Sequence, residues 1–170
     1  MKYNTFLGKR MAQSELAIPM WESVMFHTDY CRIIEIGTFH GNFSLYLFLL
    51  TLSNQSEFYT FDIVDWRVYD HSPHIKNYLG LDNHFKKMDV FESVGFISDL
   101  IKRNGISVLF CDGGDKEREF NTFSPFLKWG DIIAVHDWGT EVNPENLNLE
   151  GFEDITPIND DGMTKFFKKI

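Results

Sequence analysis

The sequence of 170 residues predicts an open, doubly wound α/β sheet in a single domain. Short apolar runs alternate with segments of helical pattern, which is typical of βαβ units. The runs SVLF and IIAV are continuously apolar, as expected for parallel strands that are covered on both faces. A hydrophobic share of 44% is enough for one core, and no Ser/Gly/Pro-rich linker or internal repeat divides the chain.

The elements follow in order along the chain. Residues 1–30 are expected to form an N-terminal arm and a helix, AIPMWESVMF at 17–26, whose first turn tolerates Pro19. Five strands are then predicted, at 31–37, 57–64, 84–90, 106–112 and 131–137. Helices are predicted between them at 42–53, 72–80, 92–104 and 116–128. The turn NDDG should join two last strands, GFEDITPI and MTKFFKKI. The prediction is a seven-stranded Rossmann-like sheet, mostly parallel with a C-terminal antiparallel hairpin, in one domain spanning 1–170.

Charge and composition exclude several classes of partner. The formal net charge is -9 and no basic stripe is present, which argues against binding to nucleic acid. The apolar stretches are too short to span a membrane, and MKYNTFLGKRMAQSE lacks the long apolar region of a signal peptide. Cys31 and Cys111 adjoin apolar runs, so both are predicted to be buried and reduced. A cytoplasmic protein is expected.

Acidic residues end the predicted core strands. An open α/β sheet binds its ligand beyond the carboxyl ends of its strands, so these side chains should line one crevice. They are Glu35, Asp62, Asp89, Asp112 and the pair His136–Asp137. Carboxylates suit a ligand with hydroxyls, an ammonium group or a metal ion, whereas the alternative for each residue is a helix cap.

The loop after the first core strand, Gly37 to Gly41, indicates which class of cofactor the protein can bind. A dinucleotide fingerprint needs a glycine where Phe39 stands, because the backbone must approach a pyrophosphate there. No Lys-Ser/Thr pair follows Gly41, so the loop is not a nucleotide-triphosphate loop either. We therefore expect a cofactor without phosphates.

Three segments carry a resemblance to a known family. EIGTFHGNFS resembles the first motif of class I S-adenosylmethionine-dependent methyltransferases, E-x-G-x-x-x-G. LFCDGGDKEREFNTFSPFLKWGDIIAVHDWG is similar to the signature of small O-methyltransferases, the cephalosporin-hydroxylase-like and sugar O-methyltransferase group, with catechol O-methyltransferase more distant. GKRMAQSELAIP resembles that group's N-terminal arm, so the resemblance covers nearly the whole chain. It implies an S-adenosylmethionine-dependent O-methyltransferase that acts on a small hydroxylated acceptor, such as a sugar, with the help of a divalent cation.

The resemblance also implies cofactor-binding residues: Glu35, Gly37, Thr38, Gly41, Ser44, Asp62, Ile63, Asp89 and Asp112. The glycine loop would wrap the methionine end, Glu35 would orient the loop or the ammonium group, and Ser44 would bind the carboxylate at the start of a helix. Asp62 would accept both ribose hydroxyls. Asp89 would accept the adenine amino group, with Met88 and Ile63 as apolar walls.

On the acceptor side, the resemblance implies a divalent cation, Mg²⁺ or Mn²⁺, held by Asp112, His136 and Asp137. The alternative is a hydrogen-bonded core histidine beside a capping Asp137. The chain departs from its relatives at Asp115, where many have a histidine and the catechol enzymes have a catalytic lysine. The expected catalytic residues are therefore Asp112 and Asp115, with Lys116 as a second candidate for the base.

Two other functions stay open. One is a degenerate domain that binds the cofactor or a protein partner without catalysis. The other, disfavoured by the acidic charge and by CDGGD in place of an Asn/Asp-Pro-Pro-aromatic motif, is a nucleic-acid methyltransferase. An exposed terminal hairpin could also pair two copies of the chain as a homo-oligomer.

Overall fold

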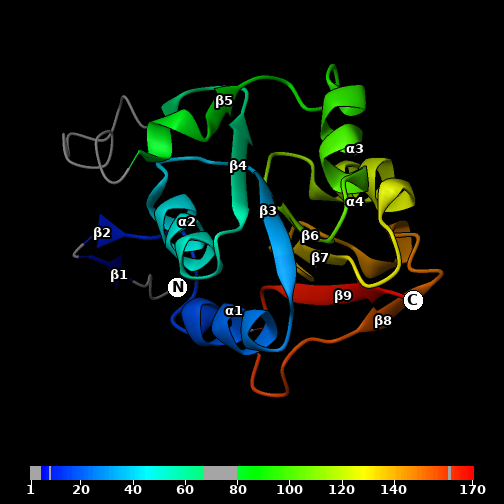
Figure 1. The fold of residues 1–170 in the computed structure, drawn as a ribbon. Helices are drawn as coiled ribbons and strands as arrows, with labels where there is room; N and C mark the ends of the chain where they lie inside the picture. The colour runs from blue at the N-terminus through cyan, green and yellow to red at the C-terminus, as the bar shows by residue number, and fades with distance from the viewer. Residues whose placement is uncertain (1–4, 8, 67–79, 161) are drawn as a thin grey trace.

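The computed structural model describes residues 5–7, 9–66, 80–160 and 162–170, and it confirms the predicted fold class (Figure 1). A seven-stranded sheet has the order β5-β4-β3-β6-β7-β9-β8. Its strands are β3 (Tyr30–Ile36), β4 (Glu57–Asp62), β5 (Phe85–Lys87), β6 (Ile106–Cys111), β7 (Ile132–Val135), β8 (Phe152–Asp154) and β9 (Lys165–Lys169). The first five are parallel to one another, and β9 is antiparallel to both β7 and β8. The predicted terminal hairpin is therefore present, with its second strand inserted beside β7.

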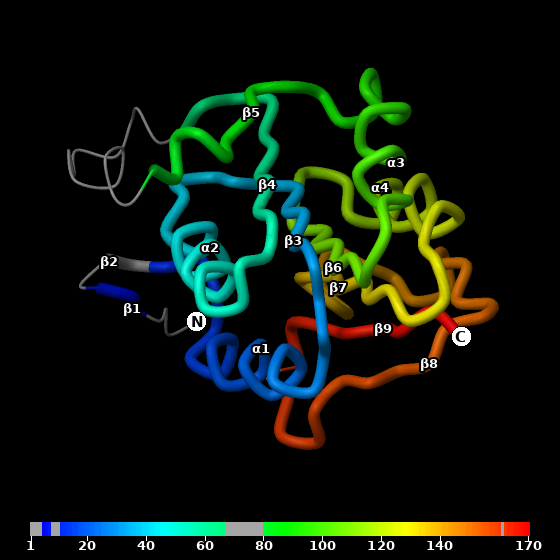
Figure 2. The backbone as a smooth tube through the Cα atoms, in the orientation of Figure 1, coloured from blue at the N-terminus to red at the C-terminus, as the bar shows by residue number. Residues whose placement is uncertain are grey.

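The order of the strands reverses between β3 and β6. The chain runs from β3 outward to β5 and then returns across the sheet to β6, a path that Figure 2 traces. Ligands of doubly wound sheets bind at such a reversal, beyond the carboxyl ends of the strands. Ile36 at the end of β3 is paired with Cys111 at the end of β6, so the segments that follow these two strands start side by side.

Helices cover both faces of the sheet (Figure 1). On one face, α1 (Ala17–Phe26) and α2 (Asn42–Asn54) pack over a core that includes Trp21, whose ring lies 4.9 Å from that of Phe110. On the other face, α3 (Val94–Lys102) and α4 (Lys116–Phe123) cover a second core. Ile33 belongs to the first core and Ile34 to the second, because successive side chains of a strand point to opposite faces.

The boundaries of several elements differ from prediction. The helix predicted at 116–128 ends at Phe123 and continues as the 3-10 turn η3 (Ser124–Phe126), because Pro125 has no backbone N–H to continue an α-helix. The short hairpin of β1 (Thr5–Phe6) and β2 (Lys9–Arg10) was not predicted, nor were the 3-10 turns η2 (Leu81–Asn83) and η4 (Pro144–Asn146). Of the helix predicted at 72–80, all but Gly80 lies outside the described residues.

The prediction for the two cysteines is half correct. Cys111 is fully buried, whereas Cys31 is exposed although it belongs to β3. The register with β6 shifts between Tyr30 and Arg32, so Cys31 has no partner residue on β6. This irregularity turns the thiol out of the core, and an apolar run in the sequence carries no sign of it.

Within the described residues, no helix has the length and apolar character that crossing a bilayer requires.

Candidate functional site

The loop between β3 and α2 is shaped by a close backbone approach. Gly37 has a φ of +101°, and a Cβ on it would lie 2.2 Å from the carbonyl oxygen of Asp112. Gly37 also donates its N–H to the carbonyl of Phe61 at 2.8 Å, so the loop is held against both neighbouring strand ends. Gly41 has a φ of +80° at the N-cap of α2. Both glycines are therefore required by the backbone, as the first motif implied.

Glu35 lies beneath this loop, with 1% of its surface exposed. The hydroxyl of Thr60 donates to its Oε2 at 2.5 Å, and the hydroxyl of Thr38 bonds that of Thr60 in turn. Burial raises the pKa of Glu35 to about 8, despite hydrogen bonds from Ser44 and Thr60. Glu35 is therefore mostly protonated at neutral pH, and it anchors the loop through a chain of hydroxyls.

The raised pKa of Glu35 predicts a stability that depends on pH. The folded protein holds a proton that the unfolded chain, with an ordinary value of 4.5, has released. The stability contribution is therefore complete below pH 4.5 and is lost as the pH rises through about 8. Glu35→Gln keeps the shape of the side chain and needs no proton. We therefore expect the stability of wild type to fall, relative to that of Glu35→Gln, by on the order of 3 kcal/mol as the pH is raised from about pH 5 to about pH 8.

Urea unfolding of both proteins at the two pH values measures this difference. Burial also raises the pKa of Glu119 to about 7, but that contribution is common to both proteins and cancels. An equal loss of stability in wild type and Glu35→Gln would contradict the assignment.

Asp62, which ends β4, fixes two backbone segments. Its Oδ2 accepts the N–H of Phe39 at 2.9 Å, and its Oδ1 accepts the N–H of Val64 at 3.0 Å. Each carboxylate oxygen has two lone pairs, so these bonds leave acceptor capacity on both oxygens. Apolar side chains are exposed around it: Phe39 is 46% exposed, Ile63 63% and Trp66 39%. Asp62 thus fixes the loop through its backbone bonds, and its carboxylate can still accept hydrogen bonds from a ligand that lies against the neighbouring apolar side chains.

Two other predicted cofactor residues have local structural partners. Ser44 is fully buried, its hydroxyl bonds the carbonyl of Thr38 and the carboxyl of Glu35, and it does not line the pocket. The Ser44 hydroxyl is thus already bonded within the fold, and its predicted contact with a ligand carboxylate stays a prediction. Asp89 accepts the N–H of Phe91 at 2.8 Å, and the preceding Met88 donates its N–H to the carbonyl of Asp62. Asp89 accordingly lies close to the end of β4.

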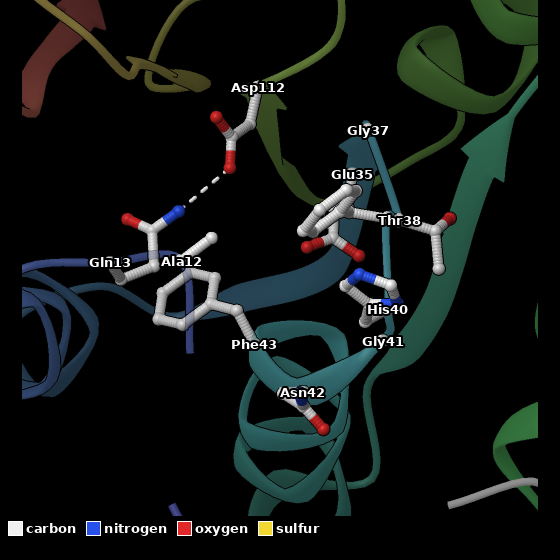
Figure 3. Close-up of a pocket in the computed structure, with 11 residues that line it drawn as sticks. Ala12, Gln13, Glu35, Gly37, Thr38, His40, Gly41, Asn42, Phe43 and Asp112 are labelled. Atoms are coloured by element: carbon white, nitrogen blue, oxygen red, sulfur yellow. Dashed lines mark hydrogen bonds between the residues drawn. The ribbon is translucent and has the colours of Figure 1, made fainter. Parts of the chain in front are cut away.

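A pocket opens between the N-terminal arm and the glycine loop (Figure 3). Ala12 and Gln13 of the arm line it on one side, and Asp112, which follows β6, lines it together with Glu35. The remaining lining residues come from the loop and the start of α2: Gly37, Thr38, Phe39, His40, Gly41, Asn42 and Phe43. Predicted cofactor residues from β3, the loop and β6 therefore meet at one cavity.

Asp112, His136 and Asp137 also come together, as predicted. Nδ1 of His136 lies 2.9 Å from Oδ1 of Asp112 and 3.3 Å from Oδ2 of Asp137. Burial lowers the pKa of His136, but the two carboxylates outweigh it and raise that pKa to about 10. The hydrogen bond from His136 in turn lowers the pKa of Asp137 to about 2. Without a metal, the imidazolium is the counter-ion of both carboxylates.

Lys116 adds a second positive charge to this cluster. Its Nζ is buried, lies 3.0 Å from Oδ2 of Asp137 and 2.8 Å from Oε2 of Glu141, and donates to the carbonyl of Gly113. Burial opposes the charge, but Glu141, Asp112 and Asp137 raise the pKa of Lys116 to about 12. Lys116 is therefore a fixed cation at neutral pH, which makes it a poor proton acceptor.

Asp115, by contrast, is exposed. It is the N-cap of α4, where its Oδ1 accepts the N–H of Arg118 at 3.1 Å. The carboxylate of Asp115 therefore caps α4 and is accessible from solvent.

Sequence reasoning assigned no role to Glu119 or Gln13. Glu119 is buried and accepts the N–H groups of Gly113 and Asp115, which fixes the segment between β6 and α4. A Cβ on Gly113 would lie 2.1 Å from Oε1 of Glu119, so the glycine is part of the same arrangement. An acidic residue in the first turn of a helix can accept the backbone N–H of the N-cap residue, and this pattern is a signal that could have identified Glu119.

Comparisons with known proteins identify the class of fold. No protein-family model matches the chain, and a comparison with curated protein sequences finds no match. Its structure, however, has the fold of class I S-adenosylmethionine-dependent methyltransferases, so the resemblance in the sequence is confirmed for the fold.

Three solved structures illustrate the similarity. A protein assigned as a caffeoyl-CoA O-methyltransferase from Staphylococcus aureus matches with a TM-score of 0.67 and 13% identity, over 94% of this chain and 86% of that one. A protein assigned as an O-methyltransferase from Klebsiella pneumoniae matches with a TM-score of 0.63 and 14% identity, over 94% and 83%. A structure described as cmcI-N160 SAH matches with a TM-score of 0.63 and 10% identity, over 98% and 81%.

Proposed function

We propose that the chain is an S-adenosylmethionine-dependent O-methyltransferase acting on a small hydroxylated acceptor. The observation that carries this proposal is the meeting of Glu35, Asp62 and Asp112 around a glycine loop at the reversal of the sheet. S-adenosylmethionine has a ribose diol, an ammonium group and a sulfonium charge, and all of these favour carboxylates. The similar structures support the same cofactor, since one is described with SAH.

The proposed cofactor spans two parts of the site. Asp62 accepts the ribose hydroxyls with the lone pairs that its backbone bonds leave free. The adenine ring lies toward Asp89, against Met88 and the exposed Ile63. The methionine end enters the pocket between the glycine loop and Asp112.

The proposed catalysis depends mainly on positioning. The sulfonium already activates the methyl group, so the protein has to align the acceptor oxygen with it and take up the hydroxyl proton. Asp115 is the proposed base, because its carboxylate is exposed and directly precedes Lys116, which contacts Asp137, whereas Lys116 itself is already protonated. A sugar or glycoside hydroxyl is an acceptor of suitable chemistry.

A divalent cation, Mg²⁺ or Mn²⁺, is also proposed at Asp112, His136 and Asp137. Adjacent ligands of an octahedral ion with bonds of about 2.1 Å lie about 3 Å apart. Ligand atoms of the three residues lie within 4.8 Å of one another, and those of His136 are 2.9 and 3.3 Å from the two carboxylates. Two oxygens and one nitrogen form a donor set suited to Mn²⁺ in particular. When bound, the ion would polarise the acceptor hydroxyl.

The raised pKa of His136 predicts that metal binding releases a proton. The imidazole must be neutral to bind a metal, but the two carboxylates raise its pKa to about 10, so it carries a proton at neutral pH. We expect Mn²⁺ to bind with release of about one proton per ion, and with an affinity that rises with pH. Calorimetry in two buffers of different ionisation enthalpy measures the protons released.

Asp137→Asn should lose Mn²⁺ binding, whereas Asp99→Asn, on the exposed side of α3, should keep it. Chelation should suppress methyl transfer and leave cofactor binding nearly unchanged. If millimolar Mg²⁺ and Mn²⁺ both fail to bind, His136 serves as the cation of a purely ionic cluster, and the metal proposal is wrong.

Transfer of a labelled methyl group tests the proposed function. Purified protein is incubated with labelled S-adenosylmethionine and a panel of phenols, sugars and glycosides, with DNA and RNA as comparison substrates. We expect label in at least one small hydroxylated acceptor and none in nucleic acid, because the chain carries a net charge of -9. Cofactor binding without transfer to any acceptor would favour the non-catalytic alternative.

A further inference from the structure

Gln13 belongs to the N-terminal arm and reaches into the pocket that Glu35 and Asp112 line (Figure 3). Its side chain is 2% exposed, and its Nε2 donates to Oδ2 of Asp112 at 2.7 Å. Its Oε1 is buried and accepts no hydrogen bond from any residue that the structure describes. A buried acceptor without a donor is rare in proteins, so this atom points to a missing ligand.

The bond to Asp112 fixes which end of the amide faces the pocket. A carboxylate accepts hydrogen bonds only, so the amino group of Gln13 must face Asp112 and its oxygen must face away. Oε1 therefore offers an acceptor that cannot be exchanged for a donor by turning the amide. Asp112 and Glu35 line the same pocket with further carboxyl oxygens, and burial together with the charges of Asp112 and Asp62 raises the pKa of Glu35.

A ligand group that satisfies these oxygens must be a donor and should be cationic. A hydroxyl offers one hydrogen and no charge, whereas a primary ammonium offers three N–H groups and a positive charge. The loop between β3 and α2, with Gly37 and Gly41, bounds the same pocket. The amino-acid end of the cofactor fits this description, and its adenosine end does not.

We propose that Oε1 of Gln13 accepts an N–H from the α-ammonium group of the cofactor, so that the N-terminal arm selects a ligand with an intact amino-acid end. This inference rests on the proposed function. Gln13 is then a specificity-determining residue that comes from outside the βαβ units of the sheet. The bond from its Nε2 to Asp112, 99 positions away, holds the amide in place for this contact.

The test is a double-mutant cycle between protein and ligand. S-adenosylhomocysteine and its deamino analogue, which keeps the carboxylate and the adenosine, are titrated into wild type and Gln13→Met by calorimetry. Methionine is close to glutamine in length and volume, but its thioether sulfur is only a weak hydrogen-bond acceptor. We expect Gln13→Met to weaken S-adenosylhomocysteine at least tenfold and the deamino analogue less than threefold.

Three other outcomes would overturn the inference. Equal weakening of both ligands would make Gln13 a support of the pocket without selectivity. If Gln13→Met binds S-adenosylhomocysteine as tightly as wild type does, the ammonium group of the ligand does not contact Gln13, and the proposed function is unaffected. Failure of wild type to bind either ligand would instead overturn the proposed function, and this inference with it.

Discussion

Replacing Gly37 with alanine is expected to lower the free energy of unfolding by about 4 kcal/mol or more and to abolish cofactor binding. The new Cβ would lie 2.2 Å from the carbonyl oxygen and 2.4 Å from the carbonyl carbon of Asp112. Both are backbone atoms, so no rotation of a side chain can relieve the contact. The φ of +101° adds strain, because it lies in a region that residues with a Cβ rarely adopt.

Gly95→Ala is the matched control for this substitution. Gly95 lies in α3, has no atom within 4 Å of the position of an added Cβ, and does not need a positive φ. Alanine in a helix is favoured over glycine, so this variant should be as stable as wild type or slightly more stable. Urea unfolding measures both variants. A Gly37→Ala protein that unfolds at the wild-type urea concentration would contradict the close approach of β3 and β6.

Asp115→Asn is expected to lower turnover by about 100-fold to 10,000-fold, the range that a general base contributes. Asparagine caps helices as well as aspartate does, so α4 should keep its start and the protein its stability. Affinity for the cofactor should also be unchanged, because Asp115 does not line the pocket of Glu35 and Gly37. The variant therefore removes proton acceptance while it preserves the fold.

Turnover of an acceptor found in the labelled-methyl assay measures this effect, and calorimetry with S-adenosylhomocysteine checks the binding. Asp99→Asn removes an exposed carboxylate on α3 and should retain full turnover. Full turnover in Asp115→Asn would transfer the role of base to another group. Lys116 is a weak successor, because its pKa of about 12 keeps it protonated.

The architecture could be predicted because the strands and helices follow from local patterns of apolar and polar residues. Continuous apolar runs identified β6 and β7, and the acid after each run marked where the strand ends. Parallel strands place those ends at one edge, so the meeting of Glu35 with Asp112 follows from the topology alone. The two glycines of the first loop were likewise visible, since each meets a backbone requirement.

What the sequence could not reveal depends on contacts between distant segments. Arg32 lies in a strand predicted to be apolar, yet it is buried and donates to Ser107 and to the carbonyl of Asn104. The exposure of Cys31 depends on a shifted register next to it. The bond from Gln13 to Asp112 joins residues 99 positions apart, so no local pattern predicts it.

The electrostatics of the acidic cluster were also hidden. A histidine with the ordinary pKa of 6.5 is mostly neutral at neutral pH and can bind a metal directly. The two carboxylates were therefore expected to need a metal ion as their positive partner. In the folded protein, Asp112 and Asp137 stabilise the imidazolium themselves, and Lys116 supplies a second cation. A metal must therefore displace a proton and approach a lysine, a cost that only the three-dimensional arrangement makes visible.

The central claim, that this acidic, glycine-looped crevice binds S-adenosylmethionine, is tested most directly by calorimetry of the full chain with S-adenosylhomocysteine, with NAD as the comparison ligand. We predict one binding event for S-adenosylhomocysteine at micromolar strength, and a loss of at least 100-fold in Asp62→Ala, where two ribose hydroxyls lose a charged acceptor worth ~1.5–3 kcal/mol per bond. NAD should bind more weakly, because Phe39 stands where its pyrophosphate needs a glycine. Tighter binding of NAD, or no binding of S-adenosylhomocysteine, would contradict the claim.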